Sequence, residues 1–427
     1  MFRRIVLLTF LFLGTLIPCF AQGQGFVSVK GHQFLINKRP YYFVGTNYWY
    51  GSLLGLEKDK TRGVERLRKE LDFLKRNGVT NLRLLGGAEG LGMLNAVPRV
   101  GPPLQPELEK FDASTLDGLD IILSEMSKRQ MKAVIFLSNN WEWSGGFQQY
   151  LIWNKVIEDK WLTEKPTWDE LRDNVAKFYT CEPCRSAYAK QAEFIITRTN
   201  KVTGRRYIDD PTIMAWELAN EPRPMRPAAN DTYSAWIKDT AAMIKRLDRK
   251  HLVTTGHEGW IGTESIELFE QAHADRNIDY LTIHIWPKNW GWLENGKMAE
   301  TFPNAIAQTV KYINDNVAVA VKLKKPMVIE EFGLPRDKQS FDPASPTTFR
   351  DRYFKKVLSF VRTNPHIAGA NFWAFAGTAR PVKGRLFWKP GDNYTGDPPM
   401  EEQGLYSIFD SDTSTWGVVR EQTAKFR

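Results

Sequence analysis

Two short stretches of the chain end in carboxylates that could work as a pair. The run "IMAWELANEPRP", residues 213–224, begins like a buried strand and then reaches Asn220 and Glu221. The run "PMVIEEFG", residues 326–333, is similar and reaches Glu330 and Glu331. Cleavage of a glycosidic bond needs one protonated acid for the leaving oxygen and one ionised carboxylate that attacks or activates water. The two runs therefore predict acid–base chemistry of this kind.

Polar and aromatic residues also close the other apolar runs. Each buried charge is costly unless it is paired, so packing alone poorly explains seven runs that end alike. The alternative is a hydrogen-bonded polar cap without chemistry. Asn220 would offer an amide to a sugar 2-hydroxyl, and Arg83 and His284 would keep one carboxylate ionised. The remaining candidates for the site are Asn139, Asn140, Trp141, His257, Glu258, Trp286 and Trp373.

Eight apolar runs of strand length must position these side chains. Helix-period segments lie between most of them, for example residues 63–78 and 232–250. This alternation predicts the α/β class and a (β/α)8 TIM barrel, whose active site forms at the C-terminal ends of the strands. An open doubly wound sheet is the alternative, but no Gly-rich phosphate loop follows the first run. The expected strands are 41–47, 79–86, 132–140, 213–221, 251–259, 280–286, 326–333 and 369–377.

Two long connections should enlarge the barrel. Residues 138–205 follow the third strand, and residues 377–415, rich in Gly, Pro, Asp and Trp, follow the eighth. A small hairpin is expected near residues 26–40. No linker is visible, so residues 22–427 are expected to form a single domain.

The N-terminus has the pattern of a secretory signal peptide. Basic "MFRR" precedes the apolar "IVLLTFLFLGTLIPCF", and small residues end the segment at Ala21. We expect residues 1–21 to be removed and the protein to be secreted or held in the cell envelope, in the periplasm or at the outer surface. A retained anchor and a lipoprotein attached through Cys19 are the alternatives.

Composition excludes two classes of partner. The net charge of +9 comes from scattered basic residues with acidic residues throughout, which favours a solvated surface and no nucleic-acid partner. No later apolar run is long enough for a membrane span. The 15 Trp residues exceed what a core needs, and some could stack on sugar rings.

Cys181 and Cys184 form a lone "CEPC" motif. Zinc would need two further ligands, and none of the six His residues lies nearby in the sequence. A local disulfide is the simplest expectation for an exported chain, with free thiols and a redox or metal role as alternatives. No cofactor and no metal are predicted.

The motifs together resemble a known family. "WELANEPR", "HIWP", "IEEFG" and "NFWAFAG" are similar to glycoside hydrolase family five, in the clan of retaining (β/α)8 glycosidases. "FVGTNYWY", "NLRLLG", "SNNWEWSGG" and "TTGHEGW" resemble its endo-β-1,4-mannanase branch, and the similarity runs from about residue 25 to the end. The resemblance implies a monomer that hydrolyses mannan, glucomannan or galactomannan.

The resemblance also implies a role for each candidate. Glu221 would be the acid/base and Glu331 the nucleophile, since the family's nucleophile precedes an aromatic–Gly pair. Because side chains alternate along a strand, Glu330 should point away from the site into packing or a salt bridge. Trp286 stands where many members carry Tyr, and Asn139 and Asn140 stand where a His is common. The implied substrate-binding set is Arg83, Asn139, Asn140, Trp141, Asn220, Arg223, Glu258, His284, Trp286 and Trp373.

Several alternatives stay open on the sequence. A β-1,4-glucanase would use the same machinery, and a non-catalytic glycan-binding barrel would be expected to lack one of the carboxylates. Glu217 could be a paired charge inside the barrel, Glu258 could cap it, and Trp216 is expected in the core. The loop residues Trp141, Trp143, Trp290 and Trp292 could equally stack on sugar or pack.

Overall fold

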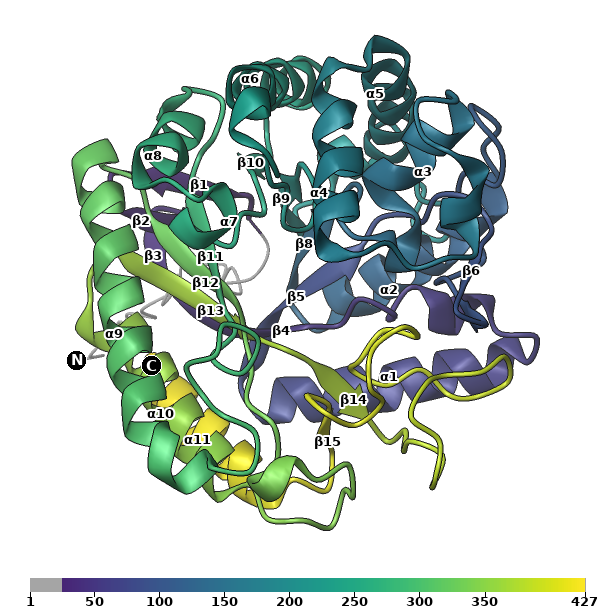
Figure 1. Ribbon diagram of the computed structural model, residues 1–427. Helices are drawn as coiled ribbons and strands as arrows, with labels where there is room; N and C mark the ends of the chain where they lie inside the picture. The colour runs from purple at the N-terminus through teal and green to yellow at the C-terminus, as the bar shows by residue number, and fades with distance from the viewer. Residues whose placement is uncertain (1–24, 427) are drawn as a thin grey trace, which may run out of the picture.

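Eight parallel strands at the centre of the molecule are enclosed by helices (Figure 1). The computed structural model describes residues 25–426. The predicted signal peptide and Cys19 therefore lie outside the described residues. Neighbouring strands follow the order β10-β9-β8-β5-β4-β13-β12-β11, and every pair is parallel. The barrel strands are β4 (Phe43–Asn47), β5 (Val79–Leu85), β8 (Lys132–Phe136), β9 (Ile213–Glu217), β10 (Leu252–Thr254), β11 (Leu281–Ile285), β12 (Met327–Phe332) and β13 (Ile367–Phe372).

The barrel closes between β10 and β11 through bonds outside the regular ladder. The Asp279 backbone N–H donates to the Val253 carbonyl at 2.8 Å, and the Thr254 hydroxyl donates to the Tyr280 carbonyl at 3.0 Å. These bonds satisfy backbone groups that two open sheet edges would leave without partners. The predicted (β/α)8 barrel is confirmed, and each of the eight expected runs overlaps a barrel strand.

The helices pack their apolar faces on the strands. In α1, Leu67, Leu71 and Leu74 are buried at spacings of three and four, and the Asp59 side chain caps the first turn by accepting from the Arg62 N–H. The helices are α1 (Lys60–Arg76), α2 (Leu116–Lys128), α3 (Gly146–Trp153), α4 (Trp168–Ala176), α5 (Glu182–Ile196), α6 (Asn230–Leu247), α7 (Trp260–Thr263), α8 (Ile266–Ala274), α9 (Met298–Leu323), α10 (Thr348–Thr363) and α11 (Thr413–Thr423). Among residues 25–426, no helix is long and apolar enough to cross a membrane.

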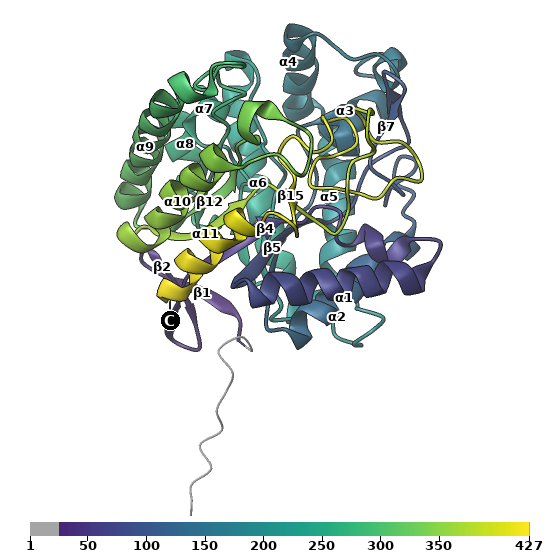
Figure 2. The same cartoon turned by 90° about the horizontal axis from the view of Figure 1, so that it is seen from below.

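A small antiparallel sheet covers the N-terminal end of the barrel. It contains β1 (Val27–Lys30), β2 (Gln33–Ile36) and β3 (Arg39–Tyr41), one strand more than the predicted hairpin. Val27, Phe34 and Ile36 are buried against residues at the starts of the barrel strands. Figure 2 shows β1 and β2 at one end of the molecule, opposite α3, α4 and β7.

The long connections lie at the other end of the barrel. The segment after β8 carries α3, α4 and α5, and a disulfide joins Cys181 and Cys184, whose Cα atoms are 5.2 Å apart. The segment after β13 carries β14 (Phe375–Gly377) and β15 (Ile408–Phe409). The short hairpin of β6 (Met93–Leu94) and β7 (Val97–Pro98), which lies in the connection after β5, was not predicted.

Candidate active site

Glu221 and Glu331 reach the same end of the barrel from different backbone settings. Strand β9 ends at Glu217, so Glu221 lies in the connection that follows, with a left-handed φ of 52°. Its N–H donates to the Gly256 carbonyl at 2.9 Å, which ties the connection to the next strand. Glu331 lies within β12. Non-glycine residues in the left-handed region are uncommon and cluster at functional sites.

The two carboxylates meet across one histidine. His284 Nδ1 lies 2.6 Å from Glu221 Oε1 and 3.3 Å from Glu331 Oε2. One oxygen of each glutamate and one His284 nitrogen lie within 4.8 Å of one another. Burial raises the pKa of Glu221 and raises that of Glu331 well above its usual value, and each negative charge adds to the other's cost. Burial also lowers the pKa of His284 well below its usual value, so this imidazole is neutral.

Arg83 of β5 connects the carboxylates to the barrel interior. Its Nη1 contacts Glu331 directly and also donates to Asn47 Oδ1 at 3.0 Å. Its Nε donates to Glu217 Oε2 at 3.0 Å, and its Nη2 donates to Asn220 Oδ1 at 2.7 Å. The guanidinium is fully buried and opposes the rise of the Glu331 pKa. The expectation that Glu217 is a paired interior charge is confirmed.

Glu330 does not line the cleft and lies at ion-pair distance from Arg83, so the predicted salt bridge is confirmed, although Glu330 also lies close to His284 inside the barrel. The β11–β12 register shifts at this point, so Ile283 pairs with Ile329 but His284 pairs with Glu331. The irregularity leaves Glu330 as an extra residue, and its Oε2 lies 3.8 Å from Arg83 Nε and 3.9 Å from His284 Nε2. Neither of its oxygens has a hydrogen-bond partner among the described residues.

Glu221, His284 and Glu331 are also a set that could hold a metal ion. Arg83 already contacts Glu331, and Trp141 Nε1 donates to Glu221 Oε2 at 2.5 Å. Each carboxylate therefore already accepts a hydrogen bond from a protein donor, and the Arg83 guanidinium supplies the positive charge that a metal cation would bring. The geometry favours a protein ion-pair network at this position.

The two asparagines after β8 support the site from behind. Asn220 Nδ2 donates to Asn139 Oδ1 at 3.1 Å, and the same oxygen accepts the Trp141 N–H at 3.1 Å. Asn140 Oδ1 accepts the Arg223 N–H at 3.3 Å. Both asparagines are fully buried. They fix the backbone that carries Asn220, Glu221 and Trp141.

A cleft of about 460 Å³ opens above the carboxylates and has an aromatic lining. The Trp286 ring lies 5.9 Å from Trp373 and 5.0 Å from Tyr406, edge to face in both cases. Such faces suit the C–H surface of a flat, hydroxylated ring. The lining residues are Trp141, Trp143, Trp168, Asn220, Glu221, Arg223, Glu258, Ile261, Trp286, Asn289, Trp290, Glu331, Trp373, Glu401 and Tyr406.

Arg223 and Glu258 form one wall of the cleft together. Arg223 Nη2 donates to Glu258 Oε1 at 2.7 Å, and its Nε contacts the other oxygen. The guanidinium lies over the rings of Trp141 and Trp168, 5.0 and 5.7 Å from their centres. Two nitrogens of the guanidinium are thus held by Glu258, and Nη1 has no partner within residues 25–426.

A family model described as GH family 5 beta-mannosidase-like matches residues 24–427. The chain belongs to this family. It is therefore a glycoside hydrolase, and the resemblance to glycoside hydrolase family five that the motifs indicated is confirmed.

Curated relatives and solved structures agree with this assignment. Mannan endo-1,4-beta-mannosidase 1 of Oryza sativa subsp. japonica is 28% identical, and the match covers 95% of this chain and 87% of that protein. Mannan endo-1,4-beta-mannosidase 1 of Arabidopsis thaliana is also 28% identical, covering 88% and 85%. The crystal structure of a Glycoside Hydrolase Family 5 Mannosidase from Rhizomucor miehei is 29% identical, with a TM-score of 0.82 and coverage of 94% and 97%.

In this family 5 hydrolase, the predicted site residues divide into two layers. Trp141, Asn220, Arg223, Glu258, Trp286 and Trp373 line the cleft with the two glutamates, whereas Arg83, Asn139, Asn140 and His284 lie behind it. Trp143 and Trp290 also line it, and Trp216 is buried in the core as expected.

Sequence analysis missed Trp168, Ile261, Asn289, Glu401 and Tyr406. Tyr406 donates to Asn289 Oδ1 at 2.7 Å, so two distant loops meet at the cleft. Only the unusual length of the segment after the eighth strand pointed to Glu401 and Tyr406.

Proposed function

We propose that this chain is a retaining hydrolase of β-1,4-mannosidic bonds. Glu221 gives its proton to the leaving oxygen, and Glu331 attacks the anomeric carbon to form a glycosyl-enzyme intermediate. Water, deprotonated by Glu221, then releases the sugar. The single observation that carries this proposal is the close approach of Glu221 and Glu331 around His284.

The charges support these roles. Arg83 contacts Glu331, whereas Glu221 accepts from Trp141 and is hydrogen-bonded to the neutral His284. Burial raises the pKa of both carboxyl groups, and two carboxylates this close cannot both be ionised without a large cost. The direct contact with the Arg83 guanidinium offsets the rise at Glu331, so Glu331 holds the charge and Glu221 holds the proton. Oxygens within 4.8 Å fit a carboxyl separation of about 5–5.5 Å, typical of retaining enzymes; a gap of roughly 6.5–9.5 Å would be needed for an intervening water.

The proposed substrates are mannan, glucomannan and galactomannan. The names of the curated relatives and the aromatic cleft support this choice. Initial rates on unbranched mannan, glucomannan, galactomannan and carboxymethyl-cellulose, measured side by side, test it. We expect mannan to be cleaved and the cellulose derivative to be resistant. Preferred cleavage of the cellulose derivative would favour the β-1,4-glucanase instead.

A second candidate function is the removal of single mannosyl units from chain ends. Three of the similar structures are of a Glycoside Hydrolase Family 5 Mannosidase from Rhizomucor miehei, one of them in complex with mannosyl-fructose. The segment after β14 also brings Glu401 and Tyr406 to the cleft, where they would shorten it. The product profile separates the two candidates. Internal cleavage releases mixed oligosaccharides from mannan early, whereas end-on cleavage releases only mannose.

We further propose that the protein is exported as a monomer and that residues 22–427 form one catalytic domain. The basic and apolar pattern of residues 1–21 supports export, and so does the Cys181–Cys184 bond, which suits an oxidising compartment. N-terminal sequencing of the exported protein should start at Gln22. Retention of residues 1–21, or a lipid on Cys19, would contradict this.

A further inference from the structure

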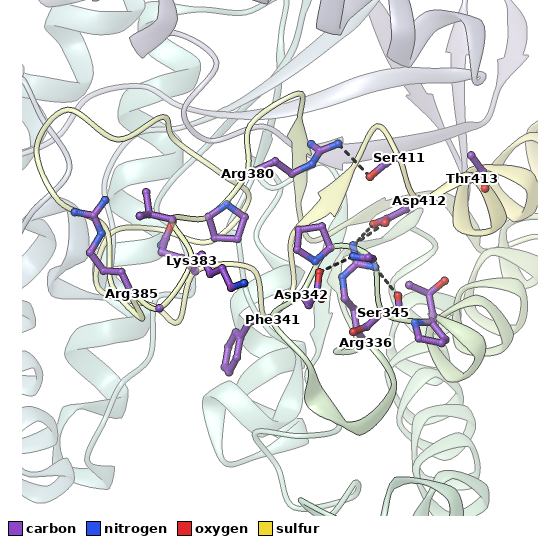
Figure 3. Close-up of a pocket in the computed structure, with 18 of the residues that line it drawn as sticks. Arg336, Phe341, Asp342, Ser345, Arg380, Lys383, Arg385, Ser411, Asp412 and Thr413 are labelled. Atoms are coloured by element: carbon purple, nitrogen blue, oxygen red, sulfur yellow. Dashed lines mark hydrogen bonds and ion pairs between the residues drawn. The ribbon is translucent and has the colours of Figure 1, made fainter.

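A second cavity, of about 820 Å³, lies apart from the catalytic cleft (Figure 3). Its walls come from the connection between β12 and α10, the segment after β14 and the turn that leads into α11. Among residues 25–426 it shares no lining residue with the cleft. A cavity of this size can hold a saccharide of one or two units.

Basic side chains dominate the polar part of this cavity. Four of them line it, Arg336, Arg380, Lys383 and Arg385, against the acidic Asp342 and Asp412. Lys383 is exposed and makes no ion pair within the described part of the chain. Arg380 is already paired within the protein, because its Nη2 donates to Asp410 at 2.6 Å. Arg385 likewise contacts Asp392 through its Nη2, so Lys383 is the one basic lining residue without an ion pair in the described chain.

The buried end of the cavity is built around Arg336. Figure 3 shows this side chain between Asp412 and Ser345, and its Nη2 donates to the two Asp412 oxygens at 2.6 and 2.7 Å. Its Nη1 donates to the Ser345 carbonyl at 3.1 Å, but its Nε has no hydrogen-bond partner in the described residues. Arg336 is only 1% exposed. A buried guanidinium nitrogen without an acceptor is costly, so an acceptor that reaches this end of the cavity would stabilise it.

Asp412 cannot neutralise this end by itself. Its carboxylate also accepts from Arg350 Nη1 at 3.3 Å, so two buried guanidinium groups share it. Arg350 is fully buried, and burial together with the nearby Arg336 lowers its pKa to about 10. Arg385 repeats the feature seen at Arg336, because its Nη2 contacts a carboxylate, that of Asp392, whereas its buried Nε lacks a partner within residues 25–426.

The first turn of α11 adds to the positive potential. Asp412 occupies the N-cap position, but its side chain makes no capping bond because the arginines and the Phe409 N–H use its oxygens. Thr413 and Ser414, the first residues of this 11-residue helix, line the cavity. The N-terminal end of a helix favours negative charge.

The rest of the cavity wall is largely apolar. It includes Phe341, Pro343, Pro346, Pro381 and Val382. An inorganic anion would leave this wall without a contact, whereas the C–H face of a sugar would cover it. We propose that the cavity binds an acidic saccharide, a sugar that carries a carboxylate or a phosphate. The acidic group would meet Arg336, Lys383 and Arg385, and the ring would lie on the apolar wall.

Isothermal titration of the mature protein with glucuronate, glucose 6-phosphate, glucose and inorganic phosphate tests this proposal. We expect at least one of the two acidic sugars to bind at least tenfold more tightly than glucose and than inorganic phosphate. Binding of glucuronate alone identifies a carboxylate ligand, and binding of glucose 6-phosphate alone identifies a phosphate ligand. Equal binding of glucose, tighter binding of inorganic phosphate than of either acidic sugar, or no binding at all would overturn the proposal.

Variants locate the binding in this cavity. The double variant Lys383→Ala/Arg385→Ala should weaken binding of the acidic sugar at least tenfold, and so should Lys383→Glu, which changes only an exposed side chain. Lys389→Ala removes an exposed lysine of the same segment that does not line the cavity, and it should leave binding unchanged. All three variants should keep the activity on mannan. Unchanged binding in both Lys383 variants would contradict the assignment.

Discussion

At the scale of single residues, the site contains more carboxylates than cations to neutralise them. Glu217, Glu330 and Glu331 surround Arg83, and the nearest of their oxygens lie within 4.0 Å of its guanidinium. Glu217 and Glu331 contact Arg83 directly and neutralise its positive charge, so little of that charge is left to stabilise an ionised Glu330. Burial and the neighbouring Glu217 therefore raise the pKa of Glu330 well above its usual value, so Glu330 is protonated near neutral pH.

Glu330→Gln should keep most of the activity, because glutamine has the shape of the protonated acid. The folded state holds a proton on Glu330 that the unfolded chain releases above its ordinary pKa of about 4.3. The free energy of unfolding of the wild type therefore falls as pH rises above that value. The glutamine variant has no such proton, so its free energy of unfolding does not fall for this reason. Denaturant unfolding should show the variant gaining stability relative to wild type between pH 4.5 and pH 8.

Glu331→Gln provides the matched comparison, because it changes the adjacent residue in the same way and should nearly abolish turnover. An inactive Glu330→Gln protein beside an active Glu331→Gln protein would reverse the assignment of the two glutamates.

Arg223→Ala should have two separable effects. Loss of the cleft-lining guanidinium should reduce kcat/KM on short manno-oligosaccharides by about 1–3 kcal/mol in transition-state binding. Arg223 also lowers the pKa of Glu221 through its charge, so its removal should raise that pKa. Because Glu221 must be protonated to act as the acid, the alkaline limb of the pH–rate profile should move to higher pH.

Arg226→Ala is a suitable control for Arg223→Ala, since Arg226 is paired with Asp169 and Asp173 outside the cleft and should change neither quantity. An alkaline limb that stays in place in Arg223→Ala would contradict the role of Glu221.

At the scale of elements, the strands were predictable and their irregularities were not. Hydrophobic periodicity located all eight barrel strands, because buried parallel strands are continuous apolar runs. The apolar run 213–221 predicts one strand, but β9 stops at Glu217 and Glu221 adopts a left-handed backbone conformation. Alternation correctly kept Glu330 out of the cleft, but it did not predict that Glu330 lies inside the barrel beside His284, because a register shift depends on the pairing partner and has no signature within the strand itself.

The loop side chains of the cleft were the hardest to predict. Trp168 and Tyr406 reach the cleft from long connections whose paths depend on tertiary contacts, such as the bond from Tyr406 to Asn289. By contrast, Arg83, Asn220 and His284 were predictable because each lies on or directly after a strand, at the end where such barrels place their sites.

The Cys181–Cys184 bond should be present in the exported protein and should contribute little stability. It closes a very short loop at the start of α5, so it removes little freedom from the unfolded chain. Thiol titration of the denatured, unreduced mature protein should find no reactive thiol. Reduction should lower the melting temperature only slightly. Two titratable thiols would show that the bond does not form.

At the scale of the whole molecule, the small N-terminal sheet closes the barrel opposite the catalytic cleft. Val27, Phe34 and Ile36 bury their side chains there, and each is worth about 1.5–3 kcal/mol. A chain that starts at Tyr42 should therefore lose about 5 kcal/mol of stability. A lower melting temperature and binding of a hydrophobic dye would show this, with a chain that starts at Gln22 as the control. Equal melting temperatures would mean that the sheet does not stabilise the barrel.

The central claim is that Glu331 attacks the sugar while Glu221 supplies the proton. A 2-deoxy-2-fluoro-β-mannosyl fluoride slows breakdown of the intermediate, so the sugar should remain attached to the nucleophile. Peptide mass spectrometry after this treatment should place one fluoromannosyl group on Glu331. A label on Glu330 or Glu221, or an active enzyme that acquires no label, would contradict the account.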